Sequence, residues 1–147
     1  MTELHPFFVH FPIALLTVAV FFDFFGAWKN TSASIKTAFI LQAIAATSAL
    51  FAAISGNSAE ALVIGQQALA QGVSDALSAH VTMGNASVWI MIAVVVGRSF
   101  TMLEQKSWAP KVWIFAFLSL ALAGLVLTTG LLGGRLSHEM LQFFMEH

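Results

Sequence analysis

The strongest constraint on this fold is a set of four apolar runs, each about as long as a bilayer is thick. A membrane-spanning helix needs roughly 20 mostly apolar residues. Four segments reach this length: about Phe7–Trp28, Ile35–Ile54, His80–Met102 and Val112–Leu132. Charged residues make up only 9% of the chain, whereas soluble domains carry about 25%. The sequence therefore predicts an all-α bundle of four transmembrane helices in a lipid bilayer, as one domain over residues 1–147.

The basic residues are distributed unevenly between the ends of these runs. Five of the six Lys and Arg residues flank the first and third connections: Lys29, Lys36, Arg98, Lys106 and Lys111. Because cytoplasmic loops carry the excess of basic residues, these two connections are predicted to be cytoplasmic. Both termini then face the periplasm of a bacterial inner membrane. Glu3, with no basic residue before the first run, is typical of an uncleaved span rather than of a signal peptide. With no basic block, nothing indicates a nucleic-acid partner.

Two segments outside the apolar runs have amphipathic patterns. In the 56–79 connection, apolar residues recur at helical spacing: Leu62, Leu69, Val73 and Leu77. This pattern predicts an amphipathic helix that lies on the outer surface of the membrane. After the fourth run, Gly133 and Gly134 are predicted to end the helix. A short interfacial helix is then expected from Arg135 to Glu146.

The histidines supply the candidate ligands, and they all fall on the predicted outer side. The chain has no Cys, which excludes thiolate metal sites and iron–sulfur clusters. An imidazole inside an apolar segment is costly unless it is ligated, hydrogen-bonded or hydrated. His5 and His10 begin the first run, His80 begins the third and His138 follows the fourth. These four are candidate cofactor ligands, and Arg135 is a candidate partner for an anionic group such as a haem propionate.

Two of these histidines, His10 and His80, are the predicted metal ligands. Both lie within about one turn of the outer boundary, on different runs. Pro12 is predicted to loosen the helix so that the His10 ring turns inward, and Gly84 removes bulk below His80. The competing structural interpretation pairs His10 with a carbonyl freed by Pro12 and makes His80 an interfacial residue. His5 is predicted to be the poorer ligand.

Two charged residues lie inside the runs near the predicted cytoplasmic side, namely Asp23 in the first and Arg98 in the third. Charges within a membrane usually pair with one another or serve a function. An Asp23–Arg98 ion pair between the two helices is the simpler interpretation. A path for protons or ions is the alternative.

The signature His5-Pro6-x-x-Val9-His10-Phe11-Pro12-Ile13-Ala14-Leu15 resembles that of a bacterial family of small four-span membrane proteins with a domain of unknown function. The tail Thr129-Gly130-x-x-Gly133-Gly134-x-Leu136-x-His138 is similar to the C-terminal motif of that family, and His80 to its mid-chain histidine. The resemblance covers nearly the whole chain. It implies a four-helix fold and a histidine-centred site, an arrangement similar to that of small b-type cytochromes.

Three classes of function follow from these observations. The first is a haem b electron carrier with two axial imidazoles, which would exchange electrons with a quinone or a periplasmic electron-transfer protein. The second is a zinc or copper site built from three or four histidines. The third is an accessory membrane subunit without a cofactor. In the haem interpretation, Phe7, Phe8, Phe11 and Trp89 are expected to wall the pocket.

Overall fold

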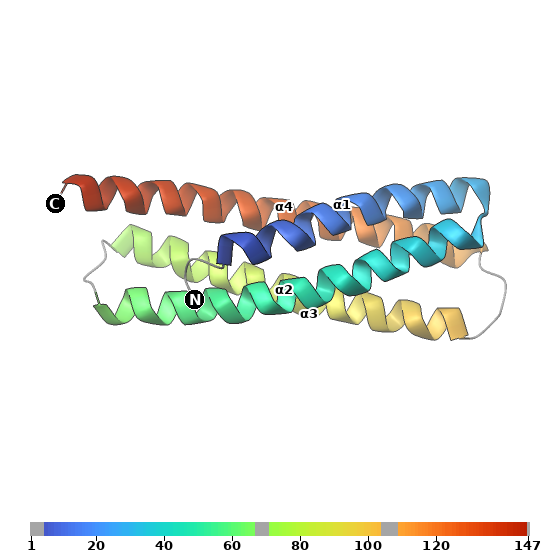
Figure 1. Cartoon of the computed structure of the whole chain (residues 1–147), viewed down its shortest axis with the longest axis horizontal. Helices are drawn as coiled ribbons and strands as arrows, with labels where there is room; N and C mark the ends of the chain where they lie inside the picture. The colour runs from blue at the N-terminus through green and yellow to red at the C-terminus, as the bar shows by residue number, and fades with distance from the viewer. Residues whose placement is uncertain (1–4, 67–70, 104–108, 147) are drawn as a thin grey trace.

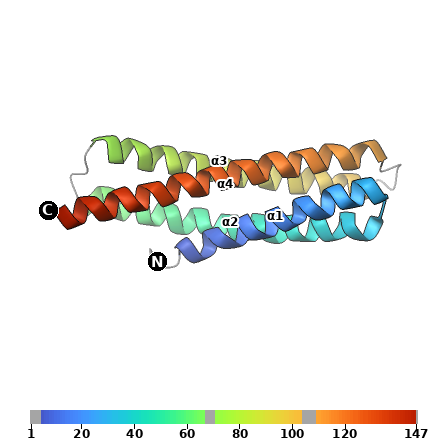
Figure 2. The same cartoon turned by 90° about the horizontal axis from the view of Figure 1, so that it is seen from above.

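The structure, a computed structural model, describes residues 5–66, 71–103 and 109–146, and side chains mainly within 7–58, 73–103 and 111–138. It consists of four long helices that lie side by side (Figures 1 and 2). In chain order they are α1 (His5–Lys29), α2 (Ser32–Gln66), α3 (Gln71–Leu103) and α4 (Ala109–Glu146). Each helix packs against its neighbour in the chain, and α4 also packs against α1. As a consequence, α1 and α3 lie across the bundle from one another.

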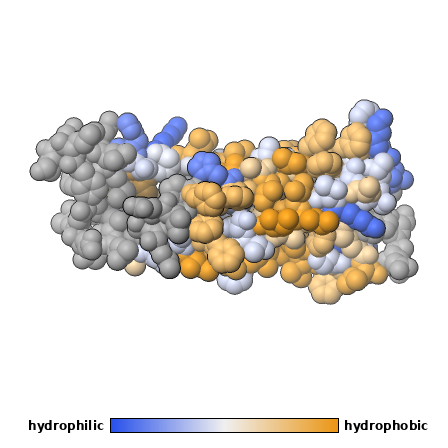
Figure 3. All heavy atoms as spheres, viewed as in Figure 1, coloured by the Kyte–Doolittle hydropathy of each residue, from blue (hydrophilic) through white to orange (hydrophobic). Residues whose placement is uncertain are grey.

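All four helices are long and apolar enough to cross a membrane, with mean hydropathy values between 1.8 and 2.2 over their most apolar windows. Large apolar side chains face outward along them, for example Phe21 (63% exposed) and Trp89 (70% exposed). Figure 3 shows apolar side chains over most of the middle of one face. This confirms the predicted multi-pass membrane bundle, because such a surface is stable only in a lipid environment.

The interior is built largely from small side chains. Alanines of α2 and α4 pack around a few larger apolar residues of α1, α3 and α4: Leu16, Ala45, Ala46, Ala49, Val88, Met91, Leu122 and Ala123. In a bilayer the hydrophobic effect does not drive helices together, so close approach and van der Waals contact must do so. The small residues of the second run permit that approach.

A tight turn joins α1 to α2. Asn30 adopts a left-handed conformation (φ 53°), which Asn tolerates better than most residues. The amide of Thr31 donates to the carbonyl of Gly26 at 3.1 Å, and Gly26 leaves room for Ile35, whose Cγ1 would lie 2.9 Å from an added Cβ. The turn therefore sends α2 back antiparallel to α1.

The 56–79 connection differs from its prediction. Instead of one surface helix, α2 continues to Gln66 and α3 begins at Gln71, with only 67–70 between them, outside the described residues. The described parts of this connection are helical, but they belong to two helices that extend past the apolar runs. Leu69 and the side chain of Leu62 lie outside the described residues. Leu77 is buried, and Asn85 of α3 donates to Asn57 of α2 at 3.2 Å. The separate connector helix is therefore wrong.

The predicted helix end at Gly133 and Gly134 is also wrong, since α4 runs through both to Glu146 without a break. Among the described glycines none has a positive φ, which the predicted C-cap would need. The interfacial segment from Arg135 is thus the end of α4 itself. Because α1 has 25 residues and the other helices have 33 to 38, the other three extend beyond the start of α1 (Figure 1).

Candidate functional site

Two polar regions lie at opposite ends of the bundle. We call the region around His10 and His80 the histidine end, and the region around Asp23 and Arg98 the ion-pair end. The sequence predicted candidate ligands at the first and a buried ion pair at the second.

At the histidine end, the imidazole of His80 lies directly against the backbone of α4 at Gly133. A Cβ added to Gly133 would lie 2.7 Å from His80 Cε1 and 3.2 Å from Nε2, closer than side chains can pack. One turn away along α4, Gly130 receives Ile13 of α1, whose Cδ1 would lie 3.1 Å from an added Cβ. The two glycines therefore fix where α3 and α1 contact α4.

His80 is seated within the bundle rather than at its rim. Its side chain is half-buried. One turn further toward the histidine end, Leu77 on α3 (9% exposed) and Leu136 on α4 (6% exposed) are buried. Apolar packing thus continues past the level of the imidazole on both helices that hold it.

The described side chains among the remaining predicted ligands are more exposed than that of His80. His10 is exposed, on the side of α1 that also carries the exposed Ala14 and Thr17. Arg135 and His138 are exposed on either side of the buried Leu136. His5 is the first residue of α1, and its side chain lies outside the described ones.

The local features expected around His10 also differ from their predictions. Helix α1 runs through Pro12 without interruption, and Pro12 is buried. Three of the aromatic residues expected to wall a pocket face outward instead: Phe7 (59% exposed), Phe11 (45%) and Trp89 (70%). Phe8 stacks on Phe51 of α2 with ring centroids 6.1 Å apart. These rings pack at or toward the surface rather than around His80.

At the ion-pair end the predicted salt bridge is confirmed. Arg98 Nη2 lies 2.5 Å from Asp23 Oδ1, and Nη1 donates to Asp23 Oδ2 at 2.9 Å. Both side chains are almost fully buried, at 2% and 0% exposed. The contact is bidentate, the geometry that suits guanidinium and carboxylate best.

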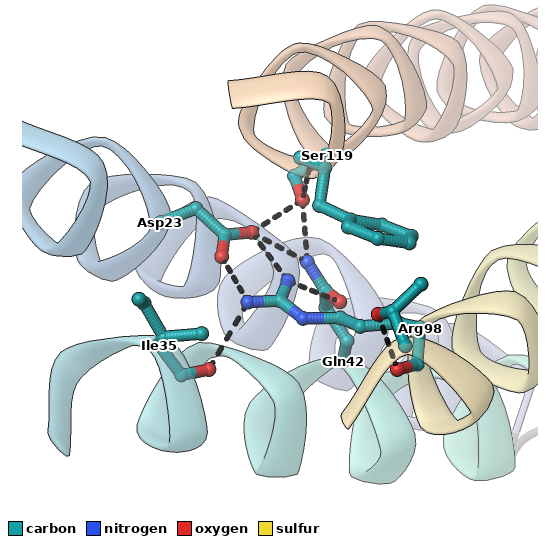
Figure 4. A network of polar contacts seen from close by, with 7 residues as sticks. Asp23, Ile35, Gln42, Arg98 and Ser119 are labelled. Carbon is teal, nitrogen blue, oxygen red and sulfur yellow. Dashed lines mark hydrogen bonds and ion pairs between the residues drawn. The ribbon is translucent and has the colours of Figure 1, made fainter. Parts of the chain in front are cut away.

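Two further residues, Gln42 and Ser119, complete a cluster to which every helix contributes one side chain (Figure 4). Gln42 Nε2 donates to Asp23 Oδ2 at 2.7 Å and also to Ser119 Oγ. Ser119 Oγ donates to Asp23 Oδ2 at 2.5 Å. We refer to these four residues as the four-helix cluster.

The four-helix cluster satisfies its own hydrogen-bonding groups. Beyond its bonds to Asp23, Arg98 donates from Nη1 to Gln42 Oε1 at 3.0 Å and from Nη2 to the carbonyl of Ile35 at 3.0 Å. All four Nη protons are thereby used. The charges cancel, so the cluster is suited to joining helices rather than to holding a further ligand.

Sequence reasoning missed Gln42 and Ser119, although a signal existed. Gln42 is the one amide inside the second run, and a buried amide in an apolar run needs a partner. Serine gives a weaker signal, since its hydroxyl can bond to its own helix instead; Ser119 Oγ also lies within hydrogen-bonding distance, 2.7 Å, of the Phe115 carbonyl.

A family model described as "Predicted membrane protein (DUF2231)" matches residues 2–141. The chain belongs to this family. The match confirms the resemblance to a four-span family of unknown function, and it covers both the histidine end and the four-helix cluster. No curated protein and no solved structure matches the chain.

Proposed function

We propose that this membrane protein holds a haem b at its histidine end and serves as a small electron carrier. The observation that supports the proposal is the position of His80, whose half-buried imidazole lies against Gly133 inside the bundle. An imidazole in a largely apolar site near the end of a helical bundle is a usual axial ligand of haem b.

The donor set fits a haem better than it fits a zinc or copper site. Imidazole is the only strong nitrogen donor, since the chain has no Cys. A protein zinc site needs three or four ligands, yet among the described side chains no three His, Asp or Glu residues lie close enough to share a metal ion. A haem needs fewer protein ligands than such a site, and His80 would be one of the residues that hold it.

When bound, the haem would supply reversible one-electron chemistry. The chain's own residues have two tasks at this site. His80, whose ring position is set by its contact with Gly133, would hold the haem iron, and the buried Leu77 and Leu136 would restrict the access of water from the nearby membrane surface. Arg135, exposed on α4, is available to an anionic group at the rim.

The charge distribution supports a place for the site on the periplasmic side of a bacterial inner membrane. Lys29, Lys36, Arg98 and Lys111 all belong to the ion-pair end of their helices, whereas Arg135 lies at the histidine end. By the excess of basic residues on cytoplasmic sides, the histidine end and both termini face the periplasm. A quinone in the bilayer or a periplasmic electron-transfer protein would then be the partner.

Absorption spectra of the purified protein, oxidised and reduced, test the proposal. Protein produced with ample haem should show a six-coordinate low-spin b-type spectrum, and His80→Ala should lose it. Thr82→Ala, at an exposed position of the same helix, is the matched control and should keep it. Protein that binds no haem and instead holds stoichiometric zinc or copper, measured by metal analysis, would overturn the proposal.

A further inference from the structure

We infer that the groove between α2 and α3 binds an isoprenoid quinone, with the quinone ring at Asn57 and Asn85 and the apolar tail along the groove. The inference rests on the proposed haem site, because it names the membrane partner of that site. It follows from the order in which apolar and polar side chains line the contact between the two helices.

The groove has a volume of about 260 Å³ and is lined by small or apolar side chains of both helices, among them Ala43, Thr47, Leu50, Ile92 and Val96. Thr47, Leu50 and Val96 are exposed, so the groove opens at the lipid-facing surface. The hydroxyl of Thr47 donates to the carbonyl of Ala43 in its own helix at 2.9 Å. The polar group of the lining is therefore already bonded within α2, and the groove suits an apolar chain.

Two side-chain amides, which we call the amide pair, lie beyond one end of the groove. On α2, Asn57 follows Leu50 by seven residues. On α3, Asn85 precedes Ile92 by seven residues. Seven residues are two helical turns within about 20°, so each amide lies on the face that lines the groove, about 10 Å further along the axis. The side chain of Asn85 donates to that of Asn57 at 3.2 Å, which shows that the two faces meet there.

The amide pair lies near the membrane surface at the histidine end. Asn57 is the last residue but one of the apolar segment Ser32–Ser58 of α2, whereas the groove lies about two turns deeper. A ligand that occupies both places has a polar head near the surface and an apolar tail in the hydrocarbon region.

The hydrogen-bonding groups of the amide pair are neutral. The bond between the two amides uses one of their four N–H groups, and the side chain of Asn57 is exposed. N–H donors are therefore accessible to the carbonyl oxygens of an uncharged quinone ring. A phosphate group is recognised best by Arg or Lys, but neither the amide pair nor the groove lining contains a charged residue. This chemistry favours a quinone over a phospholipid.

The amide pair is also close to the proposed haem site. Asn85 follows His80 by five residues on α3, a rise of about 7.5 Å. The two side chains contact different helices, since His80 lies against Gly133 of α4 and Asn85 bonds to α2. A quinone at the amide pair would lie near a haem held by His80 without occupying its place.

Photolabelling of the full-length protein in detergent tests the inference. The probe is a short-chain ubiquinone with an azide on its ring, and mass spectrometry of digested protein identifies the labelled residues. Label should map to α2 and α3 near the amide pair, saturate with probe concentration and be displaced by excess decylubiquinone. Saturable label elsewhere only, or no saturable label, would overturn the inference.

Variants test the two parts of the site separately. The double variant Asn57→Ala/Asn85→Ala should need at least about tenfold more probe for half-maximal labelling, because hydrogen bonds to the ring are lost. Ala43→Leu should also need more probe, because the larger side chain fills the groove. Ala121→Leu, at an exposed position of α4, is the matched control and should label like the wild type. Equal labelling of all four proteins would contradict the site.

Other occupants of the groove give different results. Displacement of the probe by phosphatidylglycerol but not by decylubiquinone would show a phospholipid site. A dimer that Ala43→Leu dissociates, measured by light scattering, would show an interface between two copies of the chain. Either result would overturn the inference.

The labelling does not depend on bound haem, so the two proposals can fail separately. Protein that binds haem but shows no saturable label would overturn the quinone site and leave the haem site intact. Protein that is labelled at the amide pair but binds no haem would support the quinone site and contradict the proposed electron carrier.

Discussion

The two ends of the bundle handle polar groups in opposite ways. At the ion-pair end, two charges and two polar side chains are buried and bonded to one another. At the histidine end, one imidazole is seated against a glycine, while His10, Arg135 and His138 are exposed. Buried charges that pair with one another inside a bundle hold its helices together. The comparison assigns stability to the ion-pair end, whereas the histidine end carries the proposed haem site.

The largest expected effect comes from breaking the ion pair. Asp23→Asn leaves Arg98 as a buried charge without its counterion, which costs about 3–5 kcal/mol of unfolding free energy. Adding Arg98→Gln should recover part of this loss, because neither partner is then charged. Thermal unfolding in detergent of the two single variants and the double variant measures the coupling. Strictly additive losses would show that the pair contributes nothing as a pair.

A smaller effect, of about 1–3 kcal/mol, is expected from overpacking the seat of His80. In Gly133→Ala the new Cβ would lie 2.7 Å from His80 Cε1, so the imidazole must move. Gly134→Ala is the matched control, since a Cβ there meets nothing within 4 Å and alanine favours a helix. In Gly133→Ala the unfolding temperature should fall and the haem spectrum should change. In Gly134→Ala the unfolding temperature should not fall and the haem spectrum should stay the same. Equal unfolding temperatures and spectra of the two variants would contradict the close contact between His80 and Gly133.

The smallest expected effect is that of Ser119→Ala, at about 1 kcal/mol. The change removes one donor to Asp23 Oδ2, but Gln42 and Arg98 still bond to the same oxygen. Thermal unfolding should register this loss, whereas the haem spectrum should stay the same because the histidine end is not touched. A spectral change in this variant would show that the two ends are coupled and that their division of roles is incorrect.

The sequence predicted the parts of this fold that depend on composition along the chain. Hydropathy located the four spans, and two isolated charges at similar depth, Asp23 and Arg98, predicted their own pairing. The helix ends were less predictable, because apolar character stops near the membrane surface while backbone hydrogen bonding continues beyond it. Helices α2, α3 and α4 therefore run further than their apolar runs.

The candidate site was harder to predict because it depends on rotation about a helix axis. Gly133 reads as a helix terminator in the sequence, yet its role is to let the His80 ring approach the backbone. Depth along the run, on which the choice of His10 over His5 depended, says nothing about the side of α1 on which a residue lies. The buried positions of Pro12 and Leu16 show which side of α1 faces the interior of the bundle.

The four-helix cluster also constrains how the chain is assembled during synthesis. A lone carboxylate is expensive in the lipid core, and the helices emerge in the order of their numbers. Asp23 obtains its first partner, Gln42, as soon as the α1–α2 hairpin is inserted. Arg98 follows with α3, and Ser119 closes the set with α4. Insertion in chain order therefore supplies each new polar side chain of the cluster with a partner from the helices inserted before it.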